Sequence, residues 1–197
     1  MRSQDSEGSW GARVALAGAA ALIATLLALG PPVTAEPAAG ARAERLREAL
    51  RRHPLRGLDG RTLPAAALDG EVVVVSFWAT WCKPCRRELP SLDALHAELA
   101  GKGGRVVAVS IDTDPANVRR FVRTHGLRLP VYVDGPEGLA RDLDLDHVPF
   151  TMVLDRSGAL AHATSGAGAA GLAAIAAEAR RAAERPHLSA SPAGAAR

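Results

Sequence analysis

An uninterrupted apolar run at residues 71–79, EVVVVSFWA, constrains the fold of this chain more than any other stretch. A strand without alternating polar residues is typical of a sheet that is covered on both faces, as parallel sheets are. A second run of this kind, RVVAVSI, occupies residues 105–111. Segments with helical spacing alternate with these strands, which favours parallel βαβ pairing, and residues 150–155 and 159–164 predict a closing antiparallel hairpin. The sequence therefore predicts an α/β fold, with a central mixed β-sheet and helices on both faces.

The first 35 residues predict an export segment. Arg13 precedes an apolar run at residues 14–29, and residues 33–35, VTA, have the small-residue spacing of a cleavage site. Residues 1–35 are therefore expected to be a signal peptide or an N-terminal membrane anchor, with a buried core helix as the alternative. The first two interpretations place the rest of the chain outside the cytoplasm, where disulfides persist.

The remainder of the chain divides into three parts. Residues 36–54 have helical spacing and are otherwise charged, which predicts a linker helix. Residues 55–184 are expected to form the main domain, which opens with a hairpin turn at Asp59-Gly60. Residues 185–197, rich in proline, alanine and serine, predict a disordered tail.

The charge pattern argues against nucleic acid as a partner. The formal net charge is +3, and the basic residues are scattered along the chain. A nucleic-acid surface needs a basic stripe with interleaved aromatic side chains, which this sequence lacks. Hydrophobic residues make up 48% of the chain, which is enough for one substantial core.

Both cysteines, Cys82 and Cys85, lie in the sequence WCKPC, just after the first apolar strand. Residues 82–101 have helical spacing, so the pair is expected at a helix N-terminus. Unpaired N–H groups and the helix dipole favour an anion there, which stabilises the thiolate, the nucleophilic form of cysteine. Pro84 is tolerated in a first turn, whose N–H groups have no intrahelical partner. Such a pair can attack a disulfide, form a mixed disulfide and resolve it internally.

Other uses of a C-x-x-C pair fit less well. A zinc site needs two more ligands, and the sequence has neither a second C-x-x-C nor an H-x₃₋₅-H motif. A c-type haem site needs a histidine after the second cysteine, where this chain has Arg86. A structural disulfide stays open as an interpretation, although closing so small a loop restrains the unfolded chain little.

The stretch FWATWCKPCRRELP, residues 77–90, resembles the active site of the thioredoxin superfamily. The export segment, the LDGRTLPAAALDG hairpin region and Glu88 after the C-x-x-C favour the exported TlpA/ResA/DsbE-like thiol–disulfide oxidoreductases. The resemblance spans residues 55–183. It implies a thioredoxin-like fold with an N-terminal β-hairpin extension.

The resemblance implies roles for the residues of the motif. Cys82 is expected to be the exposed attacking thiol and Cys85 the buried resolving thiol, joined as a redox-active disulfide in the oxidised protein. Trp81, Lys83 and Pro84 are expected to tune the reduction potential. No other cofactor and no metal is implied.

The sequence HVPFTMVLD, residues 147–155, is similar to the cis-proline loop of the family. It implies a cis Pro149 beside the sulfurs, with Val148 and Phe150 facing the substrate. Phe150-Thr151 stands where this branch often has two threonines, so the substrate-facing surface is expected to differ there.

Glu88 resembles the buried acid that this branch uses to handle protons, the alternative being a surface glutamate. Thioredoxins proper usually keep an aspartate where this chain has Ser76, which also fits the branch. His147 is expected to be a plain loop residue, with a metal ligand or a proton donor as the alternatives.

The resemblance implies an exported thiol–disulfide oxidoreductase, acting as a protein disulfide reductase in cytochrome c or metalloprotein assembly. Its expected partners are protein thiols and disulfides such as those of apocytochrome c, and a membrane electron donor of the DsbD/CcdA kind. The expected location is the periplasm or the outer face of the bacterial cytoplasmic membrane.

Two other functions stay open. A copper chaperone of this fold would bind Cu(I) through Cys82, Cys85 and His147, because thiolates are soft ligands, although that branch usually has C-x-x-x-C. A thiol peroxidase, with antioxidant activity, resembles P-x-x-x-T-x-x-C, and the matching stretch SFWATWC lacks the proline.

Overall fold

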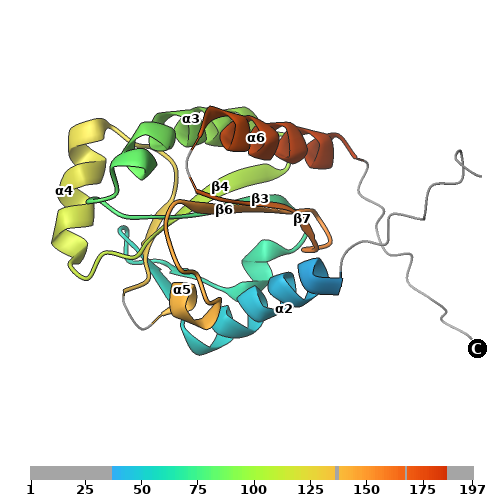
Figure 1. Cartoon of the computed structure of the whole chain (residues 1–197), viewed down its shortest axis with the longest axis horizontal. Helices are drawn as coiled ribbons and strands as arrows, with labels where there is room; N and C mark the ends of the chain where they lie inside the picture. Colours follow the sequence, from blue (N-terminus) through green and yellow to red (C-terminus); the bar gives the residue numbers. More distant parts are fainter. Residues whose placement is uncertain (1–36, 136–137, 167, 186–197) are drawn as a thin grey trace, which may run out of the picture. The chain divides into compact units, whose positions relative to one another are not determined.

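The structure, a computed structural model, describes residues 37–135, 138–166 and 168–185 (Figure 1). The predicted signal peptide or membrane anchor at residues 1–35 lies outside the described residues, as does nearly all of the predicted tail at 185–197. No helix within the described ranges combines the length and the apolar character that crossing a membrane requires.

One mixed sheet of seven strands organises the described part of the chain, in the order β2-β1-β5-β4-β3-β6-β7. The strands are β1 (Leu55–Gly57), β2 (Thr62–Leu63), β3 (Val72–Trp78), β4 (Gly104–Ser110), β5 (Val131–Val133), β6 (Phe150–Leu154) and β7 (Leu160–Ser165). β3, β4 and β5 run parallel, whereas β6 and β7 pair antiparallel beside β3. The predicted mixed α/β sheet is confirmed.

Helices cover both faces of this sheet (Figure 1). They are α2 (Pro37–Arg52), α3 (Lys83–Leu99), α4 (Pro115–His125), α5 (Leu139–Asp142) and α6 (Ala169–Glu184), with a 3-10 turn η1 (Ala65–Leu68). Val72 and Val74 of β3 pack in one apolar cluster with α3 and α6, and Val73 and Val75 pack in a second cluster with α2 and α5. The valine run lacks polar alternation because both of its faces are buried.

A short hairpin extends the sheet at one edge. β1 and β2 pair antiparallel, with Arg56 opposite Thr62, and Gly60 in the turn has a φ of 83°. A positive φ of this size favours glycine, because it has no Cβ atom to clash with the backbone. β1 also pairs antiparallel with β5, so the hairpin continues the main sheet.

The helix expected at residues 36–54 is present as α2, but it packs in the domain core and is not a linker. Its apolar side chains, spaced three and four apart, are at most 3% exposed: Ala43, Leu46, Ala49 and Leu50. Arg47 of the same helix donates hydrogen bonds to the Asp69 carboxylate and the Gly158 carbonyl. These apolar residues form a narrow stripe along α2 that covers the second face of the sheet. The charged residues between them make the stripe hard to recognise in the sequence.

Candidate functional site

The two cysteines form a disulfide at the N-terminus of α3. Their sulfur atoms are 2.05 Å apart, and Cys82 is the N-cap residue of the helix. The Cys85 backbone N–H donates to the Cys82 Sγ at 3.2 Å, and Pro84 lies in the first turn, where no N–H is required. This N–H and the helix N-terminus direct partial positive charge toward the Cys82 Sγ.

Cys82 is less accessible than the exposed attacking thiol that the sequence predicts. Cys82 is 5% exposed and Cys85 is 1% exposed. The Cys82 Sγ lies 3.7 Å from the carbonyl oxygen of Val148, so the neighbouring loop covers much of it. Trp81, directly before it, is 67% exposed, so a partner that reaches the sulfur also meets the Trp81 ring.

The loop beside the sulfurs contains a cis peptide bond between Val148 and Pro149. β6 follows this loop and pairs antiparallel with β3, with Phe150 opposite Phe77, which brings the loop to the end of β3 where α3 begins. Phe150 itself is 7% exposed and packs in the α2-side cluster, so its ring adds little to the surface of the predicted substrate loop. Side chains alternate along a strand, and the position after the proline points away from the cysteine side.

Two buried hydroxyls lie on adjacent strands near the site. Ser76 of β3 and Thr151 of β6 are register partners, and their hydroxyl oxygens are 2.9 Å apart. Ser76 is 1% exposed and Thr151 is 3% exposed, so one hydroxyl donates to the other away from water. Where thioredoxins proper keep a carboxyl, this chain therefore has a neutral hydrogen-bonded pair.

Glu88 is half-buried and faces the start of α6. Its Oε1 accepts the Gly168 backbone N–H at 2.9 Å, and the side chain lines a cavity of about 350 Å³ together with Pro84 and Arg87. Burial raises the pKa of Glu88, while the Gly168 hydrogen bond and the Arg87 charge act in the opposite direction. Glu88, expected to be a buried acid, is thus partly accessible. Its carboxylate extends to the Gly168 N–H, which has no partner within α6.

Asp112, at the end of β4, is a site residue that the sequence analysis did not identify. Its carboxylate accepts hydrogen bonds from the Thr80 N–H at 2.8 Å, the Thr80 hydroxyl at 2.6 Å and the Ser110 hydroxyl at 2.7 Å. Asp112 is 5% exposed, and Thr80 lies two residues before Cys82. The carboxylate therefore fixes the loop that leads into the cysteines. The sequence feature that could have indicated Asp112 is an acidic residue directly after a predicted buried strand, in RVVAVSID.

His147 is exposed and hydrogen-bonds through Nε2 to the Ser165 hydroxyl on β7. Among the residues that the structure describes, no group of three or more histidine, cysteine, aspartate or glutamate side chains is placed to hold a metal ion. His147 is therefore engaged by β7 through this nitrogen.

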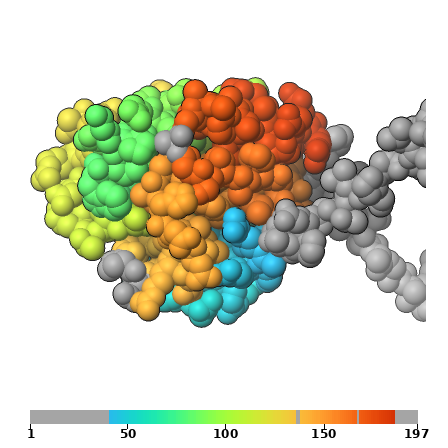
Figure 2. Space-filling view, in the orientation of Figure 1, coloured from blue at the N-terminus to red at the C-terminus, as the bar shows by residue number. Residues whose placement is uncertain are grey.

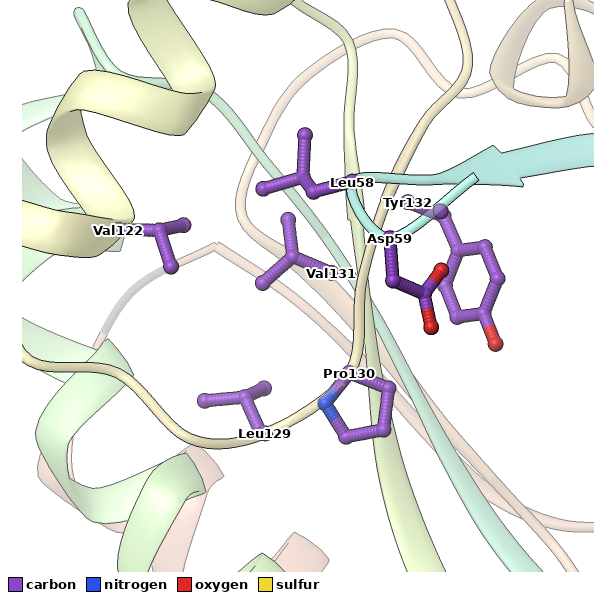
Figure 3. A pocket seen from close by; sticks show the side chains of 8 residues that line it. Leu58, Asp59, Val122, Leu129, Pro130, Val131 and Tyr132 are labelled. Atoms are coloured by element: carbon purple, nitrogen blue, oxygen red, sulfur yellow. The ribbon is translucent and has the colours of Figure 1, made fainter. Parts of the chain in front are cut away.

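A separate cavity of about 180 Å³ lies between the β1–β5 edge and α4 (Figure 3). Apolar side chains of Leu58, Val122, Leu129 and Val131 surround it, and the Tyr132 hydroxyl lies to one side (Figure 3). Burial raises the pKa of Tyr132, so its phenol stays protonated at neutral pH. None of the residues that line this cavity is a cysteine, and we assign it no part in the chemistry of the site.

Three features define a protein of thioredoxin-like fold. They are a C-x-x-C disulfide at the start of a helix, a cis-proline loop beside it, and a mixed sheet covered by helices on both faces. Residues 48–163 match the AhpC/TSA family, and the chain belongs to that family.

Named relatives agree with this class. The chain is 31% identical over 101 residues to the thiol-disulfide oxidoreductase ResA of Bacillus anthracis, which covers 51% of this chain and 58% of ResA. It is 37% identical over 109 residues to the thioredoxin-like protein YneN of Bacillus subtilis, covering 54% and 63%. The match therefore spans less than two thirds of either relative.

A solved structure agrees as well. The crystal structure of a thiol:disulfide interchange protein of the thioredoxin family from Chlorobium tepidum TLS superposes with a TM-score of 0.57 at 27% identity. The match covers 66% of this chain and 94% of that protein, so nearly all of the Chlorobium fold has a counterpart here.

Proposed function

We propose that the protein is an exported thiol–disulfide oxidoreductase that reduces disulfides in other proteins. The observation that carries the proposal is the environment of Cys82. Its Sγ accepts the Cys85 N–H at the start of α3 and lies 3.7 Å from the Val148 carbonyl oxygen, beside cis Pro149. The names of the matched relatives, thiol-disulfide oxidoreductase and thiol:disulfide interchange protein, support the same activity.

The reaction begins with the reduced pair, in which Cys82 is the thiolate. It attacks one sulfur of the substrate disulfide, so that a new S–S bond joins Cys82 to the substrate and the other substrate sulfur leaves as a thiolate and takes up a proton. The Cys85 thiol then loses its proton and attacks the Cys82 Sγ, which releases the second substrate thiolate to be protonated in turn. Two electrons pass from the cysteine pair to the substrate, and the pair ends as the Cys82–Cys85 disulfide.

Glu88 is the proposed acceptor of the Cys85 proton. It lies one helical turn beyond Cys85 on α3, and its raised pKa means that it holds a proton more readily than an exposed glutamate does. We assign the tuning of the reduction potential to Trp81, Lys83 and Pro84. A lysine cation near a thiolate lowers the thiol pKa, which changes the balance between the thiol and disulfide forms.

We place the protein in the periplasm or on the outer face of the bacterial cytoplasmic membrane. The export pattern at residues 1–35 supports this location. The resemblance of the active-site motif to TlpA/ResA/DsbE-like proteins supports apocytochrome c or a metalloprotein as substrate, and a membrane donor of the DsbD/CcdA kind that returns two electrons to the disulfide. A reporter fused at Ala39 that works only in the cytoplasm would overturn the location.

The cysteine variants test the activity. Cys85→Ala keeps the attacking thiol and removes the resolving one, so mixed disulfides should accumulate, and mass spectrometry of the adducts names the substrates. Cys82→Ala keeps only the more deeply buried thiol and should form few adducts. Apocytochrome adducts would support a role in assembly, and a broad set of folding proteins would indicate an oxidant or isomerase instead. No adducts with either variant, together with tight Cu(I) retention or peroxide consumption by the wild type, would refute the proposal.

A further inference from the structure

Exposed cations lie at the start of α3, directly after Cys82, and along α4, where Arg120 lines a hollow with Thr80 of the loop before the cysteines. The start of α3 and the outer side of α4 supply them: Lys83, Arg86, Arg87, Arg119, Arg120 and Arg123. Within the described part of the chain, none of the six lies within ion-pair distance of a carboxylate. We call these residues the α3–α4 cationic surface.

The arginines of α2 and α6 behave differently. Six of them form ion pairs with carboxylates: Arg45, Arg47, Arg51, Arg52, Arg180 and Arg181. Arg42, another residue of α2, lies over the Phe150 ring at 5.3 Å. Positive charge is thus largely ion-paired on these two helices, whereas the α3–α4 cationic surface has no such ion pair among the described residues, although the Arg87 charge acts on the Glu88 carboxylate.

A hollow of about 400 Å³ connects this surface to the active-site loop. Thr80 forms one wall, and α4 supplies the others through Asn117, Arg120, Phe121, Thr124 and His125. The Phe121 and His125 rings stack at 3.9 Å, and the Arg120 guanidinium donates to the Asn117 side-chain oxygen. The space-filling view shows the start of α3 directly beside α4 (Figure 2).

The nearest carboxylates on these two helices are already engaged with backbone groups. Asp114, the N-cap residue of α4, accepts the Ala116 N–H at 2.8 Å. Glu88 accepts the Gly168 N–H at 2.9 Å. Asp112 is buried beneath Thr80. These hydrogen bonds do not remove the carboxylate charges, and Asp146 is exposed in the loop before Val148, but the six exposed cations outnumber the carboxylates around the cysteine loop.

We propose that the α3–α4 cationic surface binds acidic residues that flank the cysteines of the polypeptide substrate, with one carboxylate entering the hollow at Arg120. The inference rests on the proposed function and specifies its substrate class. A polypeptide fits better than an anionic membrane, because lipid packed on this surface would cover the sulfur that has to react. Trp81, 67% exposed directly before Cys82, supplies an apolar contact for the same segment.

The test uses disulfide-linked peptides that differ only in the residues flanking the cysteine, which are glutamate, glutamine or lysine. The reduced full-length protein should reduce the glutamate peptide about tenfold faster than the lysine peptide at low salt, because complementary charge raises association rates. The preference should largely disappear at about 0.5 M salt, where charges are screened over a few ångströms. Each rate is normalised to that of the neutral substrate hydroxyethyl disulfide.

Variants locate the preference on the surface. Arg120→Glu combined with Arg123→Glu should reverse or abolish it, and Arg120→Gln should weaken it, with circular dichroism to check that each variant is folded. The control is Arg185→Glu, a change of the same charge at the exposed C-cap residue of α6, which should keep the wild-type preference.

The outcomes separate the two proposals. Equal rates for the three peptides, independent of salt, would overturn the charge recognition while leaving the oxidoreductase activity in place. Failure to reduce any disulfide, hydroxyethyl disulfide included, would overturn the proposed function and this inference with it. Binding to phosphatidylglycerol vesicles that is lost in the Arg120 and Arg123 variants, with peptide rates unchanged, would make the surface a lipid site and refute the inference.

Discussion

Replacing Asp112 with alanine tests whether one buried carboxylate holds the loop before the cysteines. The change leaves three donors without their acceptor: the Thr80 N–H, the Thr80 hydroxyl and the Ser110 hydroxyl. Hydrogen bonds to charged groups contribute about 1.5–3 kcal/mol each, and less where water can replace the lost partner. Thr80 is partly exposed and can be rehydrated, whereas Ser110 is fully buried.

We therefore expect Asp112→Ala to lower the free energy of unfolding by about 3 kcal/mol. In a unit of roughly 150 residues each kcal/mol shifts Tm by about 2–4 °C, so the loss should be about 6–12 °C. The assay is thermal unfolding of the oxidised protein followed by circular dichroism. Asp112→Asn retains one acceptor oxygen and should fall between the wild type and the alanine variant.

The matched control is Asp114→Ala, two residues further along. Asp114 is exposed and accepts a single N–H at the start of α4, so its loss should cost about 1 kcal/mol, the usual value for an N-cap. If Asp112→Ala is no more destabilising than Asp114→Ala, the three hydrogen bonds do not hold the loop and the reasoning is refuted.

Three further predictions concern Glu88, the buried hydroxyl pair and α2. Because the pKa of Glu88 is raised in the folded protein, its contribution to stability is fully present below the unfolded pKa and is lost as pH rises through the folded pKa. Glu88→Gln does not titrate, so it should become more stable relative to the wild type as pH rises. The same change should alter the pH profile of disulfide exchange. Parallel profiles of stability and rate in the two proteins would count against this. Thr151→Val leaves the Ser76 hydroxyl unpaired and should cost about 1–3 kcal/mol in chemical denaturation, part of which Ser76→Ala should restore; no recovery in the double variant would contradict the pairing. Leu46→Ala should lower the free energy of unfolding by about 2–5 kcal/mol in the same assay. The control Glu44→Ala, on the exposed side of α2, should lower it by less than about 0.5 kcal/mol. Equal losses would mean that α2 does not pack on the sheet.

Local chemistry in the sequence predicted much of this protein. The valine run of β3 indicates a strand buried on both faces, and Cys82 and Pro84 mark the start of α3, because capping and proline geometry depend on adjacent residues. Asp114 and Gly126 likewise mark the two ends of α4. These features depend on side chains within a few residues of one another, so they can be read without knowing what the chain packs against.

Tertiary structure alone decided which of these residues meet. The β3–β6 register pairs Ser76 with Thr151 and turns Phe150 away from the cysteine side. The parallel pairing of β3 with β4 brings Asp112 to Thr80 across 32 residues of sequence. Packing on the sheet buries α2, and the position of α4 brings Arg120 to the same hollow as Thr80 of the active-site loop. Each of these contacts follows from strand order and register, which are set by burying the whole apolar surface at once and not by any short stretch of the chain.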